Sequence, residues 1–420
     1  MPDYDTHLLK EAIIHIKAKE YEPARRYLER ALAVVDDLDT RERIHFYMCQ
    51  ITDDPVEKRK HLNETLAINP HHGEAARMLA ILDGKLKPSD IVDPDRLPAQ
   101  STETQNTKAD RFTCPKCGSR MVFDGDGRSL ICESCARTEG LKGGSLNEQS
   151  FLVAMATGQG HRAPVAMKTF KCQGCGAEFI LPPEIISENC SYCGSVYVLV
   201  GTQELVQADS IVPMAFGQRE AARRLVDWVK RHKIKPQGKV QAPRGLYLPI
   251  WTFDIIGSMP WRGIIRQNKQ IIPVTGERMV SADDLVVFST PKLADLLPKI
   301  MKDFTFSESA SYDPRYLAGW PAEIYKKTLA EASLDARERI IKETRKNIYS
   351  ERSDVSDLTY SPAQISILSF KLVLIPIWVT EYKLEDRPYR VIINGQTGSV
   401  YGERASRGVV GWLGDLLGGE

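Results

Sequence analysis

The 420-residue sequence lacks the features of several large classes of protein. It has no run of about 18 apolar residues, so we predict that no segment spans a membrane. Its first residues, MPDYDTHLLKEAII, carry neither the basic start nor the apolar stretch of an export signal. The formal net charge is only +1, which gives no overall electrostatic reason to bind nucleic acid. With ordinary hydrophobic (42%) and charged (26%) content, the sequence predicts a soluble, multidomain protein of the cytoplasm.

Common catalytic motifs are missing as well. There is no G-x-x-x-x-G-K-[ST] phosphate loop, no G-x-G-x-x-G that opens a helix after a strand, no G-x-S-x-G and no H-E-x-x-H. The adjacent carboxylates Asp283 and Asp284 are not an acid–base pair by pattern, because neighbours in a helix or strand point apart. We therefore predict that the protein is not an enzyme. An enzyme whose site assembles from scattered C-terminal residues is our third hypothesis.

Cysteine is present in a regular pattern. Eight of the nine cysteines form two quartets, each with the spacing Cys-x2-Cys-x14-Cys-x2-Cys. A Cys-x-x-Cys pair on a tight turn directs two thiolates to one point, and a second pair on a hairpin completes the tetrahedron that Zn2+ prefers. We predict two zinc ribbons in tandem, with iron as the alternative metal. The predicted ligands are Cys114, Cys117, Cys132 and Cys135 in the first ribbon, and Cys172, Cys175, Cys190 and Cys193 in the second.

Both metal sites are predicted to be structural, because four thiolates fill the coordination shell of each zinc ion. Glycine follows three of the four pairs, at Gly118, Gly176 and Gly194, where a knuckle turns its amides towards the sulfurs. Disulfides or a thioredoxin-like redox pair fit less well, because nothing indicates export and there are four pairs. The ninth cysteine, Cys49, is predicted to lie in a helix core.

Residues 1–83 are predicted to form helices with a 34-residue repeat. The segment around Ala31 aligns with that around Thr65, at the period of tetratricopeptide repeats. Such helix pairs bind proteins, so we expect a protein partner here; an unrelated helical hairpin is the alternative. About two units are visible and arrays need three or more, so this unit would lean on a neighbour or a partner. The residues expected at packing positions of the second helix are Tyr21, Ala24, Tyr27 and Ala31.

The largest region, residues 205–405, is predicted to be an internally duplicated α+β domain. The sequence LPIW at 248–251 matches IPIW at 375–378. Downstream, IIPVTG at 271–276 matches IINGQTG at 392–398 with one residue inserted. Each half also contains a helical segment. Antiparallel meanders with helices on one face fit this order better than alternating parallel units do.

Two local features of this domain carry further predictions. The dipeptide Asn394-Gly395 predicts a hairpin turn, because both residues tolerate a positive φ. A helix within 219–235 carries seven Lys or Arg residues, which suggests a nucleic-acid or membrane surface. Two acidic residues interrupt that patch. We therefore favour the solvated face of a helix whose Leu225 and Trp228 enter the core.

The last residues are predicted to form an amphipathic tail that packs on the protein's own body, in a partner's groove or at a membrane interface, with at most peripheral membrane contact. Its apolar residues fall on one helical face: Val409, Trp412, Leu413, Leu416 and Leu417. The predicted domain order is a helical domain (1–83), a linker (84–110), zinc ribbon 1 (111–140), a linker (141–168), zinc ribbon 2 (169–200), the duplicated domain (205–405) and the tail (406–420).

The sequence resembles a bacterial family, the TFIIB-type zinc-ribbon proteins, some of which are labelled similar to primosomal protein N′. The residues that carry the resemblance are the ribbon pair, the two PIW motifs, YLAGW at 316–320 and the NGQTG run from Asn394 to Gly402. It covers roughly residues 111–405. It implies a protein that recruits other proteins, in some members at the membrane in envelope-stress systems. Many members continue into membrane spans, whereas this sequence has the short tail and adds the helical front.

We therefore predict a non-catalytic zinc-binding adaptor or scaffold in the bacterial cytoplasm, at most peripheral at the inner membrane surface. The alternative is a nucleic-acid-associated zinc-ribbon factor in transcription or replication. Across residues 111–200 there are nine Lys or Arg and eight Asp or Glu, so the ribbons are nearly neutral and nucleic acid is not the favoured partner. No small-molecule substrate is indicated.

Overall fold

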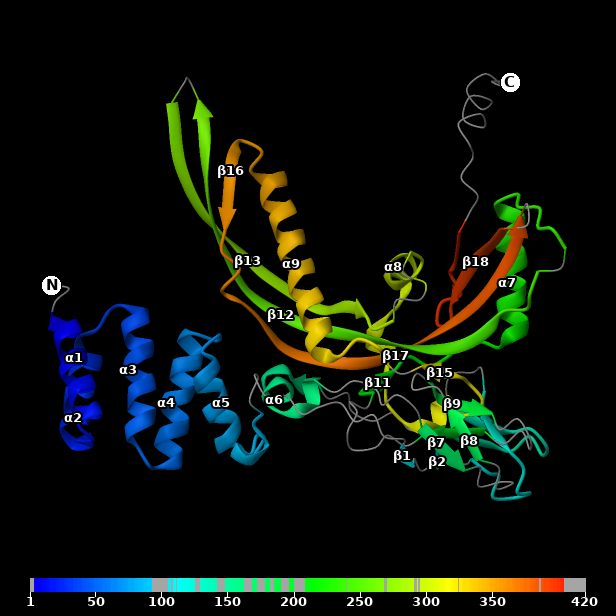
Figure 1. The fold of residues 1–420 in the computed structure, drawn as a ribbon, viewed down its shortest axis with the longest axis horizontal. Coiled ribbons are helices and arrows are strands. Elements are labelled where there is room, and N and C mark those ends of the chain that lie inside the picture. The colour runs from blue at the N-terminus through cyan, green and yellow to red at the C-terminus, as the bar shows by residue number, and fades with distance from the viewer. Residues whose placement is uncertain are drawn as a thin grey trace.

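The structure, a computed structural model, combines an N-terminal array of helices with a long, curved sheet (Figure 1). In this view the helices lie below one arm of the curved sheet, and the short strands β7 (Lys168–Lys171) and β8 (Glu178–Leu181) lie below its other arm. The described residues are 4–92, 105–106, 109–110, 112–124, 129–141, 148–161, 168–171, 178–181, 185–189, 196–199 and 208–403, the last range without residues 239, 268–269, 291–292, 294, 324 and 385–386.

The helical front, residues 4–82, confirms the predicted 34-residue spacing. Its helices are α1 (Tyr4–Lys17), α2 (Tyr21–Val34), α3 (Leu38–Ile51), α4 (Pro55–Ile68) and α5 (Gly73–Leu82). The starts of α1 and α3 lie 34 residues apart, and so do the starts of α2 and α4. Ala31 and Thr65, which this offset makes equivalent, are both fully buried. Ala24 is buried as expected, but Tyr21 is 49% exposed, so its predicted packing role is wrong.

Side chains at the helix starts explain where α3 and α4 begin. The carboxylate of Asp37 accepts a hydrogen bond from the backbone N–H of Thr40 at 2.7 Å. The carboxylate of Asp54 accepts one from the N–H of Glu57 at 3.2 Å, and Pro55 occupies the first turn. These groups satisfy N–H donors that the first helical turn leaves open. Cys49 is fully buried in this front, as predicted.

The large sheet is built on two long antiparallel strands, β12 (Arg244–Gln267) and β17 (Ile365–Leu384). Each forms a hairpin on its outer side, β12 with β13 (Gln270–Phe288) and β17 with β18 (Arg387–Asn394). The two PIW motifs face each other in this register, with Leu248 opposite Ile375. Trp251 then lies opposite Leu372, and Trp378 lies opposite Gly245. The register relates the motifs by a local two-fold axis, as two equivalent halves would require.

The second predicted match between the halves is wrong. Asn394 pairs with Ile377, whereas the equivalent residue Ile250 pairs with Phe288, far along the chain from IIPVTG at 271–276. The β12–β13 hairpin is longer than the β17–β18 hairpin. Residues at similar distances along the chain from the two PIW motifs therefore do not occupy equivalent positions. The predicted hairpin at Asn394-Gly395 is present, with β19 (Val400–Gly402) returning along β18. Its positive φ falls at Gly398 (+81°).

The two long helices cover the same face of the sheet. Helix α9 (Leu329–Glu351) buries Ala332 and Ala336 in one cluster with Trp251. Helix α7 (Gln218–Arg231) buries Leu225 and Trp228 in one cluster with Trp378, as predicted for the basic helix. Each helix precedes the long strand of its own half and packs on the strands of the other half.

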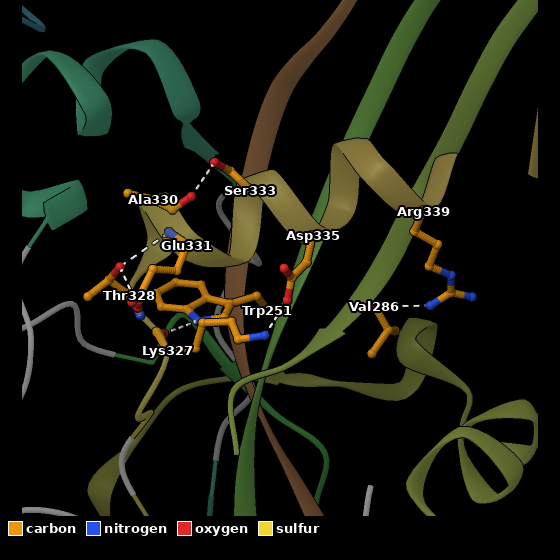
Figure 2. A network of polar contacts seen from close by, with 9 residues as sticks. All are labelled: Trp251, Val286, Lys327, Thr328, Ala330, Glu331, Ser333, Asp335 and Arg339. Atoms are coloured by element: carbon orange, nitrogen blue, oxygen red, sulfur yellow. Dashed lines mark hydrogen bonds and ion pairs between the residues drawn. The ribbon is translucent and has the colours of Figure 1, made fainter. Parts of the chain in front are cut away.

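Polar contacts fix the start of α9 on the sheet (Figure 2). Thr328 and Glu331 form a capping box, in which each side chain accepts a hydrogen bond from the other residue's backbone N–H. The indole Nε1 of Trp251 donates to the carbonyl of Lys327 at 2.9 Å. Further along the helix, Arg339 donates to the carbonyl of Val286 at 2.9 Å. These contacts tie the helix to the hairpin β12–β13.

Shorter elements complete the fold. The opposite face of the sheet packs Leu248, Ile250 and Ile375 against α8 (Leu297–Ile300). Among the described residues, no helix is long and apolar enough to cross a membrane. The remaining strands are β1 (Gln105–Asn106), β2 (Ala109–Asp110), β3 (Met121–Phe123), β4 (Ser129–Cys132), β5 (Thr138–Gly140), β6 (Gln149–Ser150), β7 (Lys168–Lys171), β8 (Glu178–Leu181), β9 (Ile185–Asn189), β10 (Val196–Leu199), β11 (Ser210–Ile211), β14 (Ala310–Ser311), β15 (Ala322–Glu323) and β16 (Val355–Tyr360).

Both predicted linkers contain docked elements. In the segment predicted as linker 141–168, β6 pairs with β17, and α6 (Phe151–Ala156) packs against β17 and α5. In the segment predicted as linker 84–110, the N–H of Val92 donates to the carbonyl of Ala156 at 2.9 Å. Where the structure describes these two segments, they therefore make contacts with elements distant in sequence, and apolar residues such as Phe151 pack against the sheet. The predicted tail, 406–420, lies outside the described residues.

Candidate metal centre

The first cysteine quartet gathers at one point. The sulfur atoms of Cys114, Cys117, Cys132 and Cys135 all lie within 4.8 Å of one another. The Sγ–Sγ distance is 3.6 Å between Cys114 and Cys135 and 3.5 Å between Cys117 and Cys132. A tetrahedral ion with Zn–S bonds of about 2.3 Å holds its sulfurs about 3.8 Å apart. The four positions therefore fit a single tetrahedral metal ion.

Tight hairpin turns bring the sulfurs together. The first pair lies between the bridged residues Thr113 and Arg120. The second pair begins at the last residue of β4, and Ile131 of β4 pairs with Thr138 of β5. After the first pair Gly118 takes a φ of +72°, as predicted for a knuckle glycine. After the second pair Ala136 takes the same role with a φ of +54°. Sequence reasoning missed Ala136, because alanine gives no signal for a left-handed turn.

Hydrogen bonds and neighbouring sulfurs give the thiols of this cluster different pKa values. The hydroxyl and backbone N–H of Ser119, followed by the thiol of Cys132, lower the pKa of Cys117 to about 6. At Cys135 the backbone N–H of Arg137 lowers the pKa, whereas burial and the nearby sulfurs raise it. The net result is a pKa of about 11. In a close cluster of cysteines, one thiolate makes it harder for a neighbouring thiol to lose its proton, and so raises the pKa of that thiol. A divalent cation would replace the shared protons.

The cysteine centre packs on the YLAGW segment, residues 316–320, which we call its seat. The N–H of Phe123 in β3 donates to the carbonyl of Ala318 at 2.8 Å. In return, the indole Nε1 of Trp320 donates to the carbonyl of Phe123 at 3.1 Å. Gly319 has a φ of +87°, and a Cβ there would lie 3.1 Å from Val122. The segment therefore needs glycine at this position both for its backbone and for its close contact with β3.

The centre also shares the core of the large domain. Cys114 and Cys132 are buried in the same cluster as Trp378 and the α7 residue Leu225. The rings of Trp320 and Trp378 meet edge to face, with centroids 5.4 Å apart. The first ribbon was expected to be a separate domain between linkers. The described residues of this segment pack on residues 316–320, and their few apolar side chains share a core with the large domain.

The cysteines of the second quartet, Cys172, Cys175, Cys190 and Cys193, lie outside the described residues. The strands that flank them are described. Lys171 of β7 pairs with Glu178 of β8, and Asn189 of β9 pairs with Val196 of β10. In all four hairpins the paired residues stand seven apart, and the first cysteine follows the first of them. Strand β9 also pairs with β15, next to the YLAGW seat.

A second polar cluster was missed by sequence reasoning. The Lys371 ammonium lies 2.8 Å from the carboxylate of Asp284 and 3.2 Å from that of Glu148. Asp254 accepts a hydrogen bond from the N–H of Asp284 at 3.0 Å. The charges of Asp284 and Asp254 raise the pKa of Asp283. These contacts join segments distant in sequence, and the ion pair between Glu148 and Lys371 links the residue before β6 to β17.

The described residues thus define a mixed α-helical and β-sheet protein with a candidate four-cysteine metal centre. The chain is similar to the "Uncharacterized protein YdjG" of Bacillus subtilis (strain 168), with 28% identity over 330 residues. That match covers 73% of this chain and 94% of the relative. No family model and no solved structure matches the chain. The similarity assigns no activity, because the relative is itself uncharacterised.

Proposed function

We propose that this chain is a non-catalytic, zinc-binding adaptor of the bacterial cytoplasm that holds protein partners on a metal-stabilised scaffold. The observation that carries the proposal is the first cysteine centre. Its four sulfurs would fill a tetrahedral shell and leave no position open for substrate or water. The centre is also docked into the core beside Trp378, which suits a structural role.

The proposal includes a second structural zinc ion in the second quartet. Its support is the shared register of all four hairpins, in which Thr113, Ile131, Lys171 and Asn189 each begin a pair that closes seven residues later. With the same spacer of 14 residues between pairs, the second quartet would fold as the first does. This is also the arrangement that the resemblance to TFIIB-type zinc-ribbon proteins implies.

Protein binding is assigned to the tetratricopeptide-like front. Helices α1 to α4 extend away from the sheet, and α5 approaches the body of the molecule through α6 (Figure 1). The front exposes large apolar residues on α1, α3 and α4: Ile14 is 57% exposed, Leu38 61% and Val56 76%. Stacked helix pairs of this type offer extended surfaces to partner proteins.

The experiment that tests this function is affinity capture from the native host with the full chain and with a chain lacking residues 1–83. We expect specific proteins to be captured only by the full chain. Zinc content by elemental analysis, at about two equivalents per chain, would test the scaffold. Submicromolar binding of DNA or RNA with a steep salt dependence would favour the nucleic-acid alternative instead.

A further inference from the structure

A groove of about 920 Å3 lies where the helical front meets the sheet. Its walls come from α5, α6, the first turns of α9 and the start of β17. The two parts touch at its edge, where His71 Nδ1 lies 2.6 Å from the hydroxyl of Ser366. A molecule held in this groove would contact both the front and the large domain.

The groove is apolar, and part of its apolar lining is open to solvent. Leu334 of α9 is 68% exposed and Leu368 of β17 is 44% exposed, and both line the groove. From α6, the half-buried Phe151 and Met155 also line the groove. Large aliphatic and aromatic side chains gathered from three elements are the usual lining of a site that takes an apolar side chain.

The charged residues of the groove all have one sign. Arg77 and Arg337 line it, and none of the described residues that line it is Asp or Glu. Arg337 is held in place, because it donates to the carbonyls of Ile365 at 3.0 Å and Pro362 at 2.9 Å. Arg77 is exposed on α5 and makes no ion pair with any residue in the described part of the chain. A carboxylate is the natural complement of such a site.

We propose that this groove binds a short segment of a partner protein in which acidic residues alternate with large apolar ones. The inference rests on the proposed adaptor function and names the chemistry of its partner. The apolar side chains would cover Leu334 and Leu368, and a carboxylate would reach Arg77. A nucleic acid fits less well, because the lining holds few cations for its phosphates and is largely aliphatic.

The test uses the full chain and fluorescein-labelled peptides of 12 residues in which Glu alternates with Leu and Phe. The charge-reversed control peptide has Lys in place of Glu. We expect the acidic peptide to bind, and the affinity to fall at least tenfold with Leu334→Asp or Arg77→Glu. Both residues are exposed, so the variants should fold, which circular dichroism would check.

Matched variants outside the groove provide the controls. Ile271→Asp changes an aliphatic residue of similar exposure (66%) on β13, and Arg26→Glu reverses an exposed arginine on α2. Both should bind the acidic peptide within twofold of the unaltered chain. The proposal is overturned if the acidic peptide does not bind, if the Lys peptide binds equally well, or if all four variants behave alike. It is also overturned if Leu334→Asp converts a dimer to a monomer, since a second copy would then be the occupant.

The result can be separated from the proposed function. If Leu334→Asp and Arg77→Glu still capture the same host proteins, while deletion of residues 1–83 abolishes capture, the adaptor function stands and the groove is not its peptide site. If neither the full chain nor any of its variants captures a partner, the adaptor function itself fails, whatever the peptide measurements give.

Discussion

The two halves of the large domain bury equivalent tryptophans by different means. Trp251 lies under the 23-residue helix α9, with Tyr325 and Phe370 as aromatic neighbours. Trp378 lies beside the 14-residue helix α7, and Trp320 of the metal-centre seat packs against it. The shorter helix leaves a surface that the first cysteine centre covers. A long helix thus covers the tryptophan of one half, whereas a shorter helix and the docked four-cysteine cluster cover that of the other.

The largest effect should come from removing the metal. We expect Cys132→Ser to lower zinc content from about two equivalents to about one, because a site with three thiolates binds far more weakly. Zinc binding to small domains is worth about 10–16 kcal/mol, so the first ribbon should unfold. Since it shares a core with Trp378, hydrogen exchange should also rise in β17 and β18 while α9 stays protected.

The matched control for that experiment is Cys49→Ser. Burial raises the pKa of the Cys49 thiol to about 11, so this residue is a poor source of thiolate. The variant should keep both zinc equivalents. Equal zinc loss in Cys49→Ser and Cys132→Ser, or unchanged protection around Trp378 in Cys132→Ser, would contradict the difference between the halves.

The symmetric pair Leu372 and Gly245 offers a second way to break the comparison. Leu372 is buried opposite Trp251, and Leu372→Ala should cost about 2–5 kcal/mol in unfolding free energy. At Gly245 a Cβ would lie 2.5 Å from the Trp320 ring, so Gly245→Ala should cost about 1–3 kcal/mol through overpacking. In Cys132→Ser the cost of Gly245→Ala should shrink, as urea unfolding of the double variant would show.

The Trp251 half also carries a pH response. Burial raises the pKa of Asp209 to about 6, although Gln149 and the N–H of Leu372 donate to its carboxylate. The folded state therefore holds this proton more tightly than the unfolded state does. The contribution of Asp209 to stability should be greatest below about pH 4 and fall by about 3 kcal/mol as pH rises past about 6. Asp209→Asn should lose this slope in urea titrations; an unchanged slope would contradict the assignment.

The smallest difference concerns the two indole nitrogens. Trp251 Nε1 donates to the carbonyl of Lys327, whereas Trp378 Nε1 is buried and has no partner among the described residues. Trp251→Phe and Trp378→Phe remove the same atoms, so they leave cavities of similar size. Only Trp251→Phe also deprives a carbonyl of its donor, so it should cost about 1–2 kcal/mol more than Trp378→Phe. Equal costs in paired denaturation curves would show that the Lys327 contact contributes little.

Local spacing in the sequence predicted the features that depend on neighbours along the chain. The 34-residue helix repeat, the first cysteine cluster and the knuckle at Gly118 all follow from residue spacing along the chain. Residue spacing could not predict which segments distant in sequence pack against one another. Neither YLAGW as the seat of the metal centre nor the pairing of β6 with β17 leaves a periodic signal. The mistaken match of 271–276 arose because hairpin length, not motif order, sets strand register.

The exchange of helices between the halves constrains the order in which the chain can mature. When β12 leaves the ribosome, the helix that will cover Trp251 has not yet been synthesised, because α9 begins at Leu329. An apolar face of the nascent chain therefore stays uncovered until that helix emerges, a period in which aggregation competes with folding.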